Sequence, residues 1–67
     1  MDWRIIKQIK KDFWSWSGGF SPESADQITV YLDYALPLDI RASVEEVRRV
    51  LIDWFNADNS DEYGLGG

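Results

Sequence analysis

The N-terminal part of the chain has apolar side chains at the spacing of an amphipathic helix. With successive residues about 100° apart, one face of residues 2–16 collects Ile5, Ile6, Ile9, Phe13 and Trp16. Asp2 stands where a helix N-cap is expected, and the glycines after Ser17 favour the left-handed conformation that ends a helix. The pattern therefore predicts a first helix over residues 2–16.

The segment of residues 44–56 has the clearest helical pattern. Its apolar stripe consists of Val44, Val47, Val50, Leu51, Trp54 and Phe55. Ser43 and Glu46 have the spacing of a capping box, in which the hydroxyl and the carboxylate each bind an unpaired backbone amide at the helix start. We expect this helix to end near residue 56 and a flexible, acidic, glycine-rich tail to follow over residues 57–67.

The middle of the chain admits two interpretations. Ser21 and Pro22 are helix-start signals, and a stripe of Ala25, Ile28, Leu32, Ala35 and Leu36, with Tyr31 at its edge, predicts a helix over residues 22–35. Residues 27–36 also alternate like a strand and are rich in β-branched and aromatic side chains. We favour the helix because the start signals are helical and the only obvious partner strand lies within the first helix.

These patterns predict an all-α fold, a small three-helix bundle, with residues 1–56 as its single domain. The alternative is an α+β fold in which residues 27–36 form a strand. A chain of 67 residues holds one domain, and without cysteine it has no disulfide to stabilise it. Its core must come from packing, so we expect Trp16 and Trp54 to point inward.

The residue types present argue against catalysis and metal binding. The chain has no histidine and no cysteine, which removes imidazole bases, thiolate nucleophiles and the usual zinc ligands. Asp26 and Asp33 are two turns apart on the solvent side of the predicted second helix, too far apart to act as a pair. We therefore predict no catalytic residues, no cofactor and no metal site.

Charge divides the chain into two unequal parts. Residues 1–16 carry four basic and two acidic side chains, whereas residues 17–67 carry three basic and ten acidic ones. On the first helix, a stripe at i, i+4, i+7 and i+11 consists of Trp3, Lys7, Lys10 and Trp14. Such a stripe is typical of a contact surface. The simpler explanation, which we favour, is that both tryptophans close the bundle edges beneath lysine stems.

We predict a small, non-enzymatic protein-interaction module with an unknown protein partner, a second copy of the chain being one candidate. The candidate interaction surface consists of Trp3, Lys7, Lys10, Trp14, Val30, Tyr34 and Ile52. The alternative is that the first helix binds an anionic surface of lipid or nucleic acid. Acidic neighbours of Arg48 and Arg49 argue against DNA, and a membrane surface stays a weak candidate. With no membrane span or signal-peptide pattern, we expect a cytoplasmic location.

Overall fold

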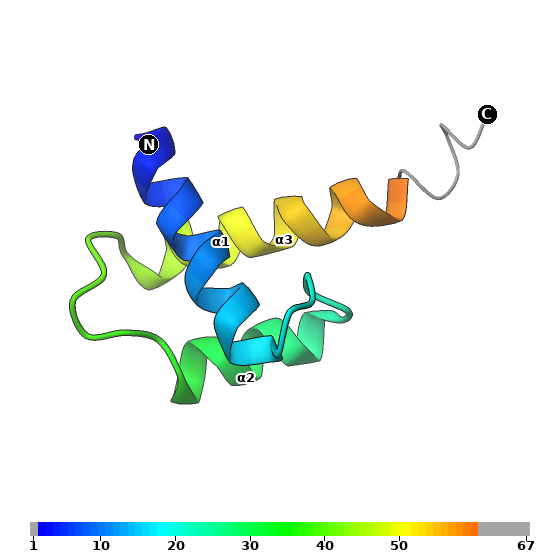
Figure 1. The fold of residues 1–67 in the computed structure, drawn as a ribbon, viewed down its shortest axis with the longest axis horizontal. Helices are drawn as coiled ribbons and strands as arrows, with labels where there is room; N and C mark the ends of the chain where they lie inside the picture. Colours follow the sequence, from blue (N-terminus) through cyan, green and yellow to red (C-terminus); the bar gives the residue numbers. More distant parts are fainter. Residues whose placement is uncertain (1, 61–67) are drawn as a thin grey trace.

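The computed structural model describes residues 2–60, which form three helices and no strand (Figure 1). Helix α1 spans Trp3–Ser17, α2 spans Ala25–Tyr34 and α3 spans Val44–Ser60. Helix α3 packs against both of the others, and α1 crosses it at an angle (Figure 1). The predicted all-α three-helix bundle is confirmed. The strand alternative is wrong, because most of the segment concerned is the helix α2.

Helix α1 begins and ends on the signals that the sequence provides. The Asp2 carboxylate accepts a hydrogen bond from the backbone N–H of Arg4 at 2.9 Å, as an N-cap does. At the other end, Gly18 has a φ of 87°, a left-handed conformation in which most residues are strained. The next amide, that of Gly19, donates to the carbonyl of Trp14 at 2.8 Å. These two glycines end α1, and the chain then reverses direction toward α2 (Figure 1).

Helix α2 begins at Ala25, later than the start at residue 22 that the sequence signals predicted. Its N-cap is Ser24, whose hydroxyl accepts from the backbone N–H of Gln27 at 3.1 Å. The Gln27 side chain reaches back and accepts from the N–H of Glu23 at 2.7 Å. Ser24 and Gln27 thus act much like a capping box, so the assignment of Ser21 as the cap was wrong. Pro22 is buried ahead of the helix.

Helix α3 begins as predicted and continues beyond the predicted end. The Ser43 hydroxyl accepts from the N–H of Glu46 at 3.2 Å, and the Glu46 carboxylate accepts from the N–H of Ser43 at 3.5 Å. The helix reaches Ser60, so residues 57–60 of the predicted tail are helical. No glycine or proline occurs between residues 56 and 60 to end the helix earlier. Residues 61–67 of the predicted tail lie outside the described part of the chain.

The core lies where the three helices meet, and the burial of two aromatic residues, Tyr31 and Trp16, is the reverse of what the sequence predicted. Its buried side chains are Ile9, Phe13, Ile28, Tyr31, Leu32, Val47, Val50 and Leu51. Tyr31, expected at the edge of its helix, is 1% exposed and packs edge-on against Phe13 with ring centroids 5.1 Å apart. Trp16, expected inside, is 41% exposed, because it lies in the last turn of α1 and covers Tyr31 from outside.

Helix α3 contributes less of its stripe to the core than its periodicity predicts. Val44, the first residue of the helix, is 46% exposed although the pattern placed it inside. Trp54 and Phe55 are only partly buried, and both pack against the edge of the core. The middle turns of α3 are therefore the ones enclosed by α1 and α2, and aromatic surface near its C-terminal half stays accessible.

Candidate interaction surface

Two tryptophans and two lysines lie along one flank of α1. Trp3 is 66% exposed and Trp14 is 50% exposed, so neither is enclosed by the bundle. The Lys7 ammonium lies 5.7 Å from the centre of the Trp3 ring, one helical turn away, within the range of a cation–π contact. The two remaining members of the stripe, Lys10 and Trp14, contact α3 instead.

Trp54 of α3, which was not among the predicted surface residues, completes this surface. Its ring is stacked on that of Trp14, with centroids 6.4 Å apart and an interplanar angle of 19°. The Lys10 ammonium lies 5.6 Å from the centre of the Trp54 ring. Phe13 touches the inner side of Trp54 at a centroid distance of 6.0 Å, which anchors it to the core. We call the five residues Trp3, Lys7, Lys10, Trp14 and Trp54 the aromatic–lysine face.

A groove between α1 and α3 adjoins the aromatic–lysine face. Its volume is about 330 Å³, and its apolar lining comes from both helices: Ile6, Val50, Trp54 and Ala57. Two charged side chains, Lys10 from α1 and Asp53 from α3, also line it. The groove thus combines apolar surface with one cation and one anion at its edge, as many protein interfaces do.

The other predicted surface residues lie elsewhere. Val30 and Tyr34, on α2, are 45% and 85% exposed, and Ile52 on α3 is 36% exposed. None of the three lines the groove beside the aromatic–lysine face. Within residues 2–60, no aromatic or cation–π contact connects Tyr34 to that face. The predicted set of seven residues therefore separates into a group of four on α1 and three scattered apolar side chains.

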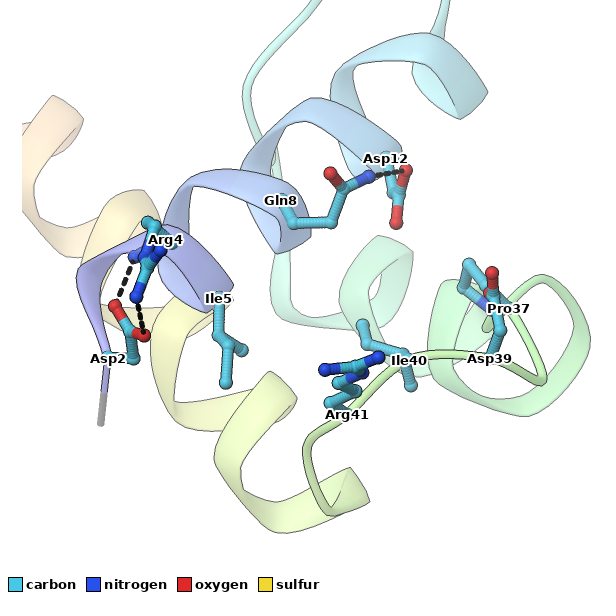
Figure 2. Close-up of a pocket in the computed structure, with 9 residues that line it drawn as sticks. All are labelled: Asp2, Arg4, Ile5, Gln8, Asp12, Pro37, Asp39, Ile40 and Arg41. Carbon is cyan, nitrogen blue, oxygen red and sulfur yellow. Dashed lines mark hydrogen bonds and ion pairs between the residues drawn. The ribbon is translucent and has the colours of Figure 1, made fainter.

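A second hollow, which the sequence analysis missed, is lined by other residues of α1 (Figure 2). It has a volume of about 500 Å³ and lies between α1 and the connection from α2 to α3. Its lining consists of Asp2, Arg4, Ile5, Gln8, Asp12, Pro37, Asp39, Ile40 and Arg41. These residues come from two segments far apart in the sequence, so no local pattern marks them.

Among residues 2–60, Tyr31 is the titratable residue whose pKa is clearly shifted from its ordinary value. Burial, with a smaller contribution from the Asp12 carboxylate, raises the pKa of Tyr31 to about 12. Its hydroxyl is buried and has no hydrogen-bond partner among residues 2–60. A phenol with this pKa stays protonated at neutral pH, so Tyr31 packs as a neutral ring and not as a base.

Three further observations bear on function. Across residues 2–60, no group of three or more carboxylates comes together as a metal site requires. No helix in this range is long and apolar enough to cross a lipid bilayer. In comparisons with protein families, curated proteins and solved structures, nothing matches this chain.

Proposed function

We propose that this chain is a protein-interaction module and that the aromatic–lysine face is its contact surface. The observation that carries the proposal is the stack of Trp14 on Trp54 with Lys10 above the same ring. It joins two helices in one exposed surface beside an apolar groove. Tryptophan is strongly enriched among the residues that contribute most binding energy at protein interfaces.

Packing supports the proposal because it fixes these side chains before a partner arrives. The rings of Trp14 and Trp54 are stacked, and the buried Phe13 packs against Trp54, so each ring is restricted by its neighbours. Ordering a mobile side chain on binding costs about 0.5–1.5 kcal/mol, and a surface that is already ordered avoids part of that cost. The exposed ring faces and the adjacent groove are then available for an apolar side chain of the partner.

Charge favours a protein partner over a phosphate-rich surface. Residues 1–16 carry four basic side chains, but the remainder of the chain carries ten acidic and three basic ones. A membrane or nucleic acid attracts the first group and repels the second. Asp53 lines the groove itself, where it opposes a phosphate close to Lys10. A protein segment with an apolar anchor and a few carboxylates fits Lys7 and Lys10 without that conflict.

The test is affinity capture from the native host with matched tryptophan variants. Trp14→Ala removes a member of the aromatic–lysine face. Trp16→Ala is the same substitution in the same helix, and Trp16 is similarly exposed but packs on Phe13 and Tyr31 instead. We expect a specific partner to bind the wild type and Trp16→Ala, and Trp14→Ala to weaken its binding about 30-fold.

Circular dichroism at the capture temperature verifies that each bait is folded, and Tyr34→Ala serves as a second control for loss of an exposed aromatic ring. Equal capture of the same proteins by all four baits contradicts the proposal. So does a partner that is lost only with Tyr34→Ala. Binding to anionic vesicles or duplex DNA that falls steeply with salt supports the anionic-surface alternative instead. Sedimentation equilibrium of wild type and Trp14→Ala shows whether a second copy occupies the face.

A further inference from the structure

Helix α2 has an outer face that faces away from the core. Its buried side chains point toward the other two helices, and on its other side lie Asp26, Val30, Asp33 and Tyr34. These residues have the i, i+4, i+7 and i+8 spacing of one helix face. All four are exposed, Val30 by 45% and Tyr34 by 85%. We call them the acidic α2 face.

The negative charge of the acidic α2 face is not balanced by nearby bases in the sequence. The chain has no lysine or arginine between Lys11 and Arg41, so every charged residue on α2 is an acid. Neither Asp26 nor Asp33 forms an ion pair with any part of residues 2–60. The two carboxylates lie on either side of Val30, about 10 Å apart along the helix axis. Both are therefore available to a cation on another molecule.

The aromatic–lysine face has the complementary charge. Neither Lys7 nor Lys10 forms an ion pair within residues 2–60, and each ammonium lies over a tryptophan ring at 5.6–5.7 Å. One acid, Asp53, lines the adjoining groove, and Asp2 pairs with Arg4 at the start of the helix. The two lysines therefore leave this face positive, and the exposed indoles beside them supply apolar surface.

We propose that a second copy of the chain binds through its acidic α2 face to the aromatic–lysine face of the first. This inference rests on the proposed function, because it keeps the same contact surface and names the partner. The two carboxylates pair with the two lysines, whose flexible stems adapt to the carboxylate spacing. Val30 and Tyr34, on the same side of α2 as the acids, pack on the exposed tryptophan rings.

Charge also selects this pairing over the two symmetric ones. Two acidic α2 faces placed together bring four carboxylates into one contact, and two aromatic–lysine faces bring four lysines together. Like charges at an interface suppress a pairing, whereas opposite charges favour it. The two faces differ, so the contact is heterologous and can repeat from copy to copy.

The association should be weak and sensitive to salt. A contact between two short helix faces is smaller than the roughly 1,200–2,000 Å² of a standard protein interface. We expect a dissociation constant on the order of 100 µM. Added salt should raise that constant, because salt screens pairs of exposed charges.

The test is sedimentation equilibrium of the full chain from about 10 µM to 1 mM, on both sides of that constant. The α1 variant carries Lys7→Glu and Lys10→Glu, and the α2 variant carries Asp26→Lys and Asp33→Lys. Each variant alone presents like charges to its own copies, so we expect its self-association to be at least about tenfold weaker. An equimolar mixture of the two should associate again, because each reversed face then meets a face of opposite sign.

Net charge alone cannot produce this recovery. The reversals change the wild-type charge of −5 by four in opposite directions, so both variants stay negative. The control carries Asp39→Lys and Glu45→Lys, which reverse two exposed acids outside both faces, and it should associate like the wild type. Circular dichroism checks that each variant is folded. Tyr34→Ala tests the acidic α2 face without a charge change and should weaken association about fivefold.

Several results would overturn the proposal. A chain that stays monomeric at 1 mM excludes the second copy, yet the proposed function stands if another protein is captured through Trp14. Loss of association in the α1 variant but neither in the α2 variant nor in Tyr34→Ala removes the acidic α2 face from the contact. A control as weak as the α2 variant, or a mixture that does not associate, also contradicts the pairing. Association unchanged in both the α1 variant and Trp14→Ala places self-association outside the aromatic–lysine face.

Discussion

Phe13 and Trp14 are neighbours in the sequence, yet they belong to two aromatic clusters with different environments. Phe13 is fully buried and contacts Tyr31 of α2 and Trp54 of α3. Trp14 is half exposed and, among the rings of residues 2–60, stacks on that of Trp54 alone. The buried cluster thus joins all three helices, whereas the aromatic–lysine face joins two of them along an open edge.

This difference in burial indicates that the buried aromatic rings mainly stabilise the fold, whereas the exposed ones are available for binding. A ring enclosed on all sides contributes its full area to the hydrophobic stabilisation of the fold, and a half-exposed ring contributes much less. Surface that is not used for folding remains available to a partner. Trp54 connects the two clusters, because its ring contacts Phe13 of the buried cluster as well as Trp14 and Lys10.

The largest effect should come from Phe13→Ala in the buried cluster. Removing an enclosed aromatic ring costs about 3–5 kcal/mol, and a domain of this size has only about 5 kcal/mol of stability. We expect the variant to be unfolded or nearly so at room temperature. A urea titration followed by far-ultraviolet circular dichroism measures the free energy of unfolding. A cooperative transition with a free energy less than about 1 kcal/mol below that of the wild type would contradict the prediction.

Trp54→Ala should have an intermediate effect, since Trp54 is only partly buried. We expect a loss of about 2–3 kcal/mol, less than for a fully enclosed ring but more than for an edge residue. The same urea titration measures it. A loss as large as that of Phe13→Ala would place Trp54 in the core, and a loss as small as that of Trp3→Ala would place it wholly on the surface.

Alkaline pH should weaken the fold through Tyr31. Its pKa is raised to about 12 in the folded chain, mainly by burial, against about 10 in the unfolded chain. Between these values the unfolded state releases the proton and the folded state keeps it, so stability falls as pH rises from 10 to 12. The slope is at most about 1.4 kcal/mol for each pH unit.

Tyr31→Phe is the matched control for the alkaline transition. It keeps the ring that packs on Phe13 and removes a buried hydroxyl that has no hydrogen-bond partner among residues 2–60. We therefore expect a change of about 1 kcal/mol or less at neutral pH, in the stabilising direction. Urea titrations at pH 7 and pH 11 should show a smaller alkaline loss than in the wild type. An undiminished loss would assign the pH dependence to other groups.

The smallest effect should come from Trp3→Ala, far from the buried cluster. Trp3 is 66% exposed and its ring contact is with the exposed Lys7 of the same helix. We expect the free energy of unfolding to fall by about 0.5 kcal/mol, measured by urea titration. Lys7→Ala, which removes the other member of the same contact, is titrated beside it as a control. A loss as large as that of Trp54→Ala would mean that the aromatic–lysine face is part of the folding core.

Interactions within one helix were predictable from the sequence. The caps at Asp2 and Ser43 depend on spacings of two or three residues, and the contact of Lys7 with Trp3 depends on one helical turn. A capping signal at Ser24 and Gln27 was present too, but Ser21 and Pro22 offered a competing start. Only the hydrogen bonds of the folded chain distinguish the two starts.

Interactions between helices were not predictable, because they depend on how the helices cross. Periodicity placed Trp16 inside and Tyr31 at an edge, and the crossing of α1 over α2 reverses this order. The packing of α1 against α3 brings Trp54 to Trp14, which are 40 positions apart in the sequence. It also places Arg41 opposite α1 and forms a hollow that no single segment contains.

The most direct test of this division of the aromatic residues follows the four tryptophan indole N–H signals by NMR while the captured partner is added. Single Trp→Phe variants assign each signal. We predict that the indole signals of Trp3, Trp14 and Trp54 shift and that the signal of Trp16, which packs on the buried cluster, stays in place. A shift of Trp16 equal to that of Trp14, or unchanged signals for all three residues of the aromatic–lysine face, would contradict the account.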